Sequence, residues 1–233
     1  MNIQDFVKDR IDRGIFKVAK IQRIPFQCPA DANALNAFRQ IGELYNDPFI
    51  IDNSNEEVYI NLLRWLFANS PMKCRAEDGR WVDGDANKGT FLGGTTGTGK
   101  TTAIKILMKM MDFCNIKVHN CEDDRMKFTQ YLATDICEIY SKDGDLSGFK
   151  KEKFLCIQDL GAEPLETLYM GNRMPVMKNI LEARGDNPNV MTIITSNLKM
   201  GGEEMAKKYG DRVVSRLYKM CNFLYMGGLD RRK

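Results

Sequence analysis

From Gly89 onward, short apolar runs alternate with segments in which apolar residues recur every three to four positions. A continuous apolar run is typical of a strand buried on both faces of a parallel sheet, and the longer period is typical of an amphipathic helix. This alternation predicts an α/β domain with a five-stranded parallel sheet sandwiched by helices. Strands are predicted near residues 90–93, 116–120, 154–158, 190–195 and 222–226. Helices are predicted near residues 101–113, 125–140, 163–184 and 202–220.

Residues 1–46 contain two apolar patterns of helical spacing, and Pro25 and Pro29 separate them. A segment of this length is too short to bury a core of its own. We therefore expect a small helical N-terminal extension.

Residues 47–88 begin with an extended stretch, PFIIDN, and continue into an amphipathic helix that ends before Pro71. The stretch 72–88 contains two glycines within a polar sequence and is predicted to be a loop or linker. The expected organisation is therefore a helical extension over 1–46, a packing helix and linker over 47–88, and the main domain over 89–233.

The size and composition of the chain are ordinary for one generous globular domain. Of its 233 residues, 43% are hydrophobic and 28% are charged, and 34 basic against 31 acidic residues leave a formal net charge of +3. Such a chain has no need of disulfide or metal support. A charge this small neither predicts nor excludes binding to nucleic acid, which would depend on a local patch.

The seven cysteines are odd in number, scattered and never spaced as C-x-x-C. This pattern indicates a reducing compartment and gives no support to a disulfide framework or a zinc site. His119 and Cys121 lie close in sequence, but one ligand pair does not make a metal site. A signal peptide and a membrane-spanning run are both missing from the pattern, so we expect a cytoplasmic protein without a membrane partner.

Residues 94–101, GTTGTGKT, match the pattern G-x-x-x-x-G-K-[ST] directly after a predicted strand and directly before a predicted helix. Gly97 and Gly99 let the backbone curl so that successive N–H groups converge on a phosphate, at the positive end of the helix dipole. Lys100 adds a charge toward the β and γ oxygens, and Thr101 offers a hydroxyl to Mg²⁺. We call residues 94–101 the phosphate loop and expect it to bind a nucleoside triphosphate with Mg²⁺.

A second polar site follows the apolar run FLCI. Phosphoryl transfer needs carboxylates near the metal and near the attacking water, and two acidic residues are usual at such a position. Here the first is Gln158 and the second is Asp159. An amide binds hydrated Mg²⁺ more weakly than a carboxylate does. Either Asp159 therefore serves the metal, or metal-dependent hydrolysis is slow, and we expect Gln158→Asp to raise turnover. Glu163 is a further candidate for the base.

Other polar residues follow later strands. Asn197 ends the strand near 190–195, where a γ-phosphate and its attacking water would lie. Arg212 and Arg216 are four residues apart and share one face of a short helix. Arg231 lies in the last few residues.

With these residues in hand, the chain resembles AAA+ ATPases, and within them the DnaC-type helicase loaders and the IstB-type transposition helper ATPases. The resemblance covers residues 49–232 and rests on four blocks in order: KGTFLGGTTGTGKTT, FLCIQDLGAEP, VMTIITSNL and YGDRVVSRL. It implies an ATPase of the P-loop fold with a minimal or absent C-terminal lid.

The resemblance also implies roles for single residues. Asp159 would activate water, Asn197 would sense the γ-phosphate, and Arg212 or Arg216 would be a finger that reaches the ATP of a neighbouring subunit, so that the chain self-associates. The implied metal ligands are Thr101 and Asp159. The implied nucleotide-binding residues are Gly94, Thr95, Thr96, Gly97, Thr98, Gly99, Lys100, Thr101, Thr102 and, as a second sensor, Arg231.

Loaders of this kind place a replicative helicase on single-stranded DNA, and residues 1–46 would hold the helicase or simply pack on the ATPase domain. Lys127, Phe128 and Tyr131 are candidates for DNA contact. Three alternatives stay open: a transposon-encoded helper whose partner is a transposase, a nucleotide-dependent switch with little hydrolysis, and a small-molecule kinase.

Overall fold

The central feature of the fold is a seven-stranded sheet in the order β3-β2-β11-β4-β10-β7-β6. The structure is a computed structural model that describes residues 2–13, 20–27, 31–119 and 125–231. The five strands from β11 to β6 run parallel, which confirms the predicted parallel sheet. These five are β4 (Gly89–Gly94), β6 (Thr129–Leu132), β7 (Phe154–Leu160), β10 (Met191–Ser196) and β11 (Cys221–Met226).

One predicted strand was placed wrongly. The run near 116–120 forms only β5 (Val118–His119), which pairs antiparallel with β1 (Gln22–Arg23) outside the main sheet. Its apolar side chains are buried by packing, with Val118 0% exposed. The edge position of the sheet belongs instead to β6, whose sequence TQYL is too polar to resemble a buried strand and was predicted as helix. An edge strand has one neighbour and needs no continuous apolar run.

The predicted linker over 72–88 is also wrong in part, because it contains two strands. β2 (Lys73–Arg75) and β3 (Trp81–Asp83) form an antiparallel hairpin that extends the sheet beyond β11. The guanidinium of Arg75 lies 3.7 Å from the centre of the Trp81 ring. Cys74 is buried in the core and Trp81 packs against it, while the other residues of the two strands are polar or exposed, which is why the sequence looks like a loop.

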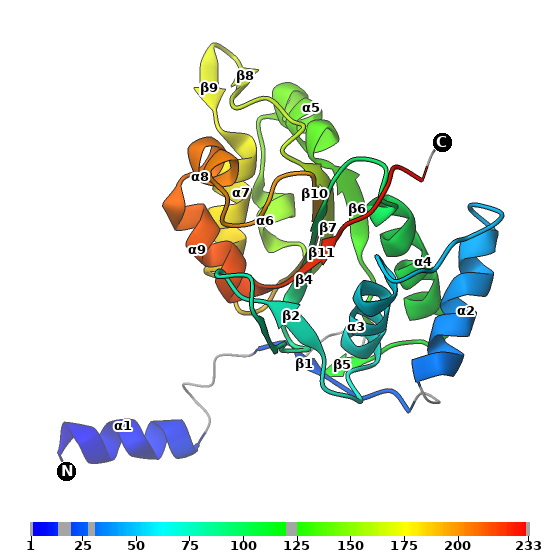
Figure 1. Ribbon diagram of the computed structural model, residues 1–233. Helices are drawn as coiled ribbons and strands as arrows, with labels where there is room; N and C mark the ends of the chain where they lie inside the picture. Colours follow the sequence, from blue (N-terminus) through cyan, green and yellow to red (C-terminus); the bar gives the residue numbers. More distant parts are fainter. Residues whose placement is uncertain (1, 14–19, 28–30, 120–124, 232–233) are drawn as a thin grey trace.

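Helices cover both faces of the sheet (Figure 1). On one face α2 (Asp31–Glu43), α3 (Glu56–Phe67) and α4 (Lys100–Phe113) share a core with Leu92 of β4. On the other face α5 (Ala133–Asp143), α7 (Val176–Gly185) and α9 (Asp211–Met220) share a core with Phe91. Adjacent residues of β4 thus serve opposite cores, as the alternation of a strand requires. The short α6 (Ser147–Lys151) contacts α7.

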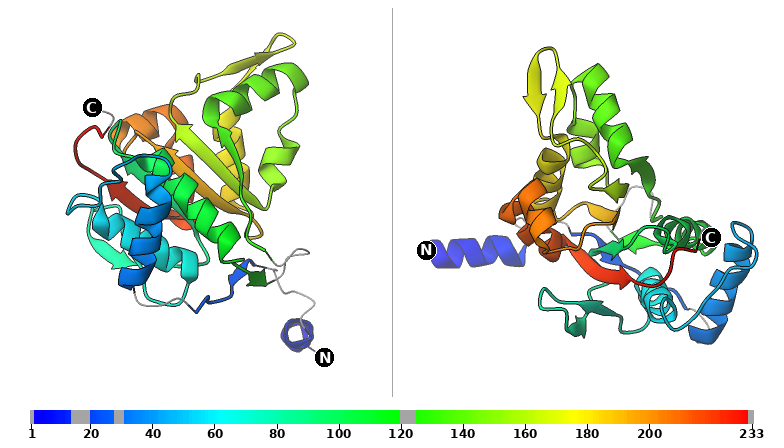
Figure 2. Two further views of the ribbon diagram at one scale, coloured as in Figure 1. Left: turned by 90° about the vertical axis from the view of Figure 1, so that its right-hand side faces the viewer. Right: turned by 45° about the horizontal axis from the view of Figure 1, so that its top comes forward.

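Two predicted helices are interrupted. The first half of 163–184 forms a hairpin of β8 (Thr167–Tyr169) and β9 (Asn172–Met174), which projects from the helical layer (Figure 2). Its turn contains Met170 and Gly171, both at positive φ. The helix predicted over 202–220 is divided into α8 (Glu203–Tyr209) and α9 by Gly210, whose φ is +85°.

The N-terminal residues are of two kinds. α1 (Ile3–Asp12) has no buried residue and lies apart from the rest of the molecule in Figure 1. α2, in contrast, packs against α3 and α4, and its Phe38 is 0% exposed. After β11 the described residues 227–231 form no helix, and we call them the C-terminal strap.

Candidate functional site

The phosphate loop connects the end of β4 to the start of α4. Gly97 and Gly99 have φ of +80° and +93°, a conformation that a residue with a Cβ adopts only under strain. α4 begins at Lys100 without a side-chain cap, so the N–H groups of its first turn remain available to an anion at the positive end of the helix. Thr98 is buried and its Oγ1 donates to the carbonyl oxygen of Thr95 at 2.9 Å. The local conformation is therefore that of an anion cradle.

Lys100 reaches across the loop to the end of the next strand. Its Nζ donates to the carbonyl oxygens of Gly94 and Thr95 at 2.8 and 2.7 Å, and to Oδ1 of Asn197 at 2.8 Å. The residue is only 5% exposed. Two predicted site residues, Lys100 and Asn197, are thus in direct contact although they are far apart in sequence.

A cavity of about 450 Å³ lies against the loop. Its lining contains predicted residues of the phosphate loop as well as Asp159 and Asn197. It also contains Phe49 and Tyr59, which sequence reasoning missed because PFIIDN showed only an extended stretch. The cavity is lined by Asn46, Pro48, Phe49, Ile50, Tyr59, Thr96, Gly97, Gly99, Lys100, Thr101, Thr102, Asp159, Ala162, Asn197 and Arg231. The predicted residues Gly94, Thr95 and Thr98 belong to the loop but not to this lining.

Asp159 is turned toward the cavity by an irregularity in β7. Ile194 of β10 pairs with Ile157 and Ser196 pairs with Leu160, so two residues of β7 oppose one residue of β10. Such a β-bulge changes the direction of a side chain. Asp159 has a φ of +53°, and its N–H donates to Oγ1 of Thr195 at 2.9 Å.

Gln158 points elsewhere. It is 7% exposed, and its Nε2 donates to Oε1 of Gln130 on β6 at 2.7 Å. Among the described residues that line the cavity, Asp159 supplies the one carboxylate. The site therefore has fewer acidic groups than metal-dependent hydrolysis usually employs.

Glu163 does not serve as the base predicted for it. Its side chain is buried and lies outside the cavity lining, where it accepts hydrogen bonds from Tyr209 and from the N–H of Gly161. Similarly, Phe128 cannot stack on a DNA base as suggested, because it is 7% exposed and its ring packs against Trp65 and Phe154.

The two candidate finger arginines differ in their contacts. Arg216 makes a two-point ion pair with Asp186, with N–O distances of 3.0 and 2.6 Å. Arg212 is exposed on α9 and forms no ion pair with the part of the chain that the structure describes. Neither lines the cavity of its own subunit.

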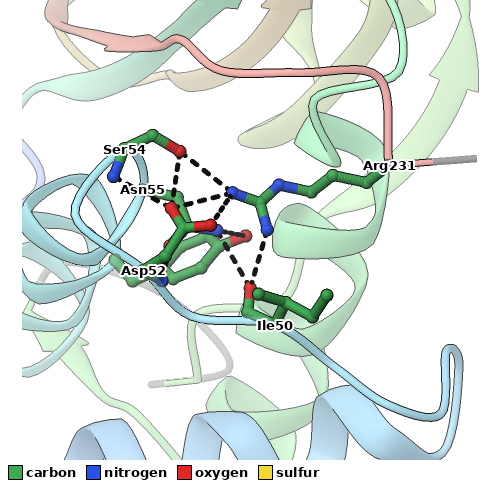
Figure 3. Close-up of polar contacts among 6 residues, drawn as sticks. Ile50, Asp52, Ser54, Asn55 and Arg231 are labelled. Carbon is green, nitrogen blue, oxygen red and sulfur yellow. Dashed lines mark hydrogen bonds and ion pairs between the residues drawn. The ribbon is translucent and has the colours of Figure 1, made fainter.

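Arg231 lines the cavity, and a network of contacts holds it (Figure 3). Its Nη2 donates to both carboxylate oxygens of Asp52 at 2.9–3.0 Å and to Oγ of Ser54 at 2.9 Å, and its Nη1 donates to the carbonyl oxygen of Ile50 at 3.1 Å. Its backbone N–H donates to the carbonyl oxygen of Gly97 at 3.0 Å. Arg231 thus joins the strap both to the phosphate loop and to the segment before α3.

The charge distribution at this end of the cavity follows from these contacts. Hydrogen bonds from Ser54 hold the pKa of Asp52 below its usual value, and Arg231 adds to that effect. Burial raises the pKa of Tyr59 to about 12, so its hydroxyl stays protonated. Asp52 is therefore the anion that balances Arg231.

These residues fit a nucleoside triphosphate with Mg²⁺. The loop gives backbone N–H groups and an ammonium group to the phosphates, and Phe49 and Tyr59 add aromatic rings to the cavity lining, which suit contact with a base. Thr101 and Asp159 both line the cavity and supply hard oxygen atoms, the ligands that Mg²⁺ prefers.

Metal-ligand clusters and membrane-spanning helices are both absent among the described residues. These residues contain no cluster of three or more His, Cys, Asp or Glu side chains able to hold a metal ion. Of the pair His119 and Cys121, which the sequence pattern does not support as a metal site, Cys121 lies outside the described residues. No helix within the described ranges has the length and apolar character needed to cross a bilayer.

The parallel sheet, with its phosphate loop between β4 and α4, has the arrangement of a P-loop NTPase fold. Two solved structures share it. The DnaC helicase loader aligns with a TM-score of 0.50 and 17% identity over 78% of this chain and 94% of its own. A protein from Streptococcus pyogenes serotype M3, described as a primosome component, aligns with a TM-score of 0.50 and 18% identity over 79% of this chain and 85% of its own. Neither a protein-family model nor a curated protein sequence matches the chain.

Proposed function

We propose that this chain binds ATP with Mg²⁺, hydrolyses it, and uses the cycle to load a replicative helicase onto single-stranded DNA. The observation that carries the proposal is the convergence of Lys100, Thr101, Asp159 and Asn197 on one cavity beside an anion cradle. The likeness in fold to the DnaC helicase loader supports the helicase step.

Each residue of the site has a separate role in this proposal. The phosphate loop binds the β- and γ-phosphates, and Lys100 exchanges its present acceptors for phosphate oxygens. Thr101 and Asp159 hold Mg²⁺, which neutralises developing charge when bound. Asp159 also orders the attacking water, and Asn197 contacts the γ-phosphate.

Self-association completes the site in this proposal, because no described arginine other than Arg231 lines the cavity. Arg212 is the better candidate for the finger in trans, since Arg216 is already paired with Asp186. A finger of this kind contributes about 10³–10⁵-fold to turnover. ATP would therefore hold subunits together and hydrolysis would release them.

The N-terminal residues have a separate place in the proposal. The 1–46 segment would hold the helicase, and α1 within it exposes Ile3 and Ile11, which are 72% and 53% exposed. The other proposed parts are the 47–88 segment, which supplies the packing helix α3 and the β2–β3 hairpin at the edge of the sheet, and the ATPase domain over 89–233.

A nucleotide-dependent switch with little hydrolysis is a second candidate, and the structure offers one observation in its favour. With Gln158 turned toward Gln130, one carboxylate must serve both the metal and the water. Binding would then be normal while turnover is slow.

The test measures the affinity for a fluorescent ATP analogue with Mg²⁺, then turnover and light scattering with and without single-stranded DNA. Lys100→Ala should abolish binding, whereas Lys105→Ala, an exposed lysine on the same helix, should not. Arg212→Ala should keep binding but lose assembly-dependent turnover, and Arg216→Ala should lose less. Normal binding without turnover would select the switch, and capture of a transposase instead of a helicase would replace the loading step. Absence of saturable binding would remove the proposal.

A further inference from the structure

A buried polar cluster joins the loop after β7 to the end of α8. Oε2 of Glu163 accepts the N–H of Gly161 at 2.8 Å, and Oε1 accepts the hydroxyl of Tyr209. Nζ of Lys208 donates to the carbonyl oxygens of Gly161 and Glu163, both at 2.6 Å, and lies 3.4 Å from Oε1 of Glu163. We call Glu163, Lys208 and Tyr209 the α8 brace.

The polar groups of the α8 brace are buried, so their hydrogen bonds are needed to offset the loss of water. The side chain of Glu163 is 1% exposed, and Tyr209 is 3% exposed. A buried carboxylate without partners would destabilise the fold strongly, whereas here hydrogen bonds satisfy both oxygens and Lys208 balances the charge. Burial raises the pKa of Tyr209, and the charge of Glu163 adds to this, so the phenol remains a donor.

The loop that the brace holds begins at Asp159. Asp159 has a φ of +53°, which a residue with a side chain seldom adopts without support from its surroundings. The carbonyl oxygen of Asp159 accepts the N–H of Ala162 at 3.0 Å, and that of Leu160 accepts Oγ of Ser196 at 2.5 Å. The N–H of Asp159 is held by Thr195, so β10 fixes one side of the loop. The brace fixes the other side.

We propose that Glu163, Lys208 and Tyr209 are positioning residues, which keep Asp159 in its strained orientation toward the cavity through the loop 160–163. This rests on the proposed ATPase function and assigns to α8 a part in the hydrolytic step. The same helix is followed at Gly210 by α9, which carries Arg212. The brace therefore links the carboxylate of one site to the helix that presents the candidate finger to the next subunit.

The test separates positioning from folding by measuring four quantities: the dissociation constant for ATP, kcat, the affinity for ADP with aluminium fluoride, and the melting temperature. The variants are Glu163→Ala, Glu163→Gln and Tyr209→Phe. Tyr140→Phe is the matched control, because Tyr140 is also 3% exposed in the same core and has a ring contact, but its hydroxyl forms no side-chain hydrogen bond with the residues that the structure describes.

We expect Glu163→Ala and Tyr209→Phe to lower kcat by about tenfold or more and to change the ATP dissociation constant by less than about twofold. A displacement of the Asp159 carboxylate by about 1 Å has a large effect on turnover, but it does not change the contacts that the phosphate loop makes with ATP. Affinity for ADP with aluminium fluoride should fall in parallel with kcat. Glu163→Gln keeps an acceptor and should recover part of the loss, and Tyr140→Phe should leave kcat unchanged.

Two results would overturn the proposal. One is a kcat of Tyr209→Phe equal to that of Tyr140→Phe. The other is a loss of ATP affinity and kcat together in proportion to the fall in melting temperature, which is the result of a purely structural role. If the wild-type protein has no turnover, the proposed ATPase function is refuted instead. Hydrogen exchange at the amide of Gly161 then tests the brace alone: Glu163→Ala should make this exchange faster, and an unchanged rate would refute the proposed contact.

Discussion

Gly97→Ala tests how the phosphate loop and the C-terminal strap fit together. A Cβ built on Gly97 would lie 1.9 Å from Oδ1 and 2.2 Å from Cγ of Asp230. Such distances are impossible, so the Asp230 side chain must leave this position, and we expect the strap to loosen from the loop with it. Gly99→Ala is the matched control, because it has a similar positive φ and its Cβ would meet nothing closer than Oη of Tyr59 at 3.8 Å.

The two substitutions share one energetic term and differ in another. An alanine at these φ values costs about 1–2 kcal/mol in either position. Only Gly97→Ala displaces the Asp230 side chain, and the loosened strap is expected to lose the hydrogen bond from Arg231 N–H to Gly97, worth about 1 kcal/mol. The exposed Arg231–Asp52 pair adds little. Gly97→Ala should therefore lower the free energy of unfolding by about 2–3 kcal/mol and Gly99→Ala by about 1–2 kcal/mol.

Urea denaturation followed by circular dichroism measures both values, and amide exchange at Arg231 reports on the strap. Exchange at Arg231 should rise in Gly97→Ala but not in Gly99→Ala. In an Asp230→Gly background the extra cost of Gly97→Ala should disappear, which a double-mutant cycle detects. Equal destabilisation by the two alanines, or an extra cost that persists without the Asp230 side chain, would show that the strap does not rest on Gly97.

Three further outcomes follow from buried groups. Arg184, which is 1% exposed, donates four hydrogen bonds of 2.7–2.9 Å to Thr192, Phe149, Glu152 and Met191, so Arg184→Met should cost about 3 kcal/mol or more in urea denaturation. Burial raises the pKa of Cys221 to about 12, so between about pH 9 and pH 11 the thiol ionises in the unfolded chain but not in the folded one. The free energy of unfolding therefore falls as the pH rises, and Cys221→Ala should reduce the slope of that fall by about 1.4 kcal/mol per pH unit. Because Gln158 is turned toward Gln130, Gln158→Asp should leave ATP turnover within about twofold of wild type, whereas Asp159→Asn should lower it by about 10²-fold or more. A large gain in turnover from Gln158→Asp would show that this side chain does reach the metal.

The sequence predicted those parts of the molecule in which a local pattern decides the structure. The phosphate loop needs glycines at fixed positions between an apolar strand and a helix, and each requirement is visible in residues 89–113. Parallel strands with two covered faces are also visible, because they must be apolar throughout. Asn197 was predicted at the γ-phosphate, and the structure brings it to Lys100 because β4 and β10 are adjacent parallel strands that end at the same edge of the sheet.

Other parts depend on long-range contacts that leave no local pattern. β6 is polar because it is an edge strand, and β2 and β3 are short and charged. The cavity combines Phe49 and Tyr59 with a loop some 40 residues later, and the sequence signal for this is only an apolar segment upstream. The pairing of Asp52 with Arg231 spans 179 residues and could not be predicted from spacing.

The bulge in β7 shows why the expectation for Gln158 had to change. In a regular strand neighbouring side chains face opposite sides, so residues 158 and 159 could not both reach one site. The extra residue opposite Thr195 and the positive φ of Asp159 turn that carboxylate into the cavity, while Gln158 keeps the regular direction toward β6. In this buried position the amide of Gln158 can donate a hydrogen bond to Gln130, whereas a carboxylate at position 158 has no hydrogen to donate. Gln158 is therefore suited to its packing position, and the chemistry of the site depends on how firmly Asp159 is held.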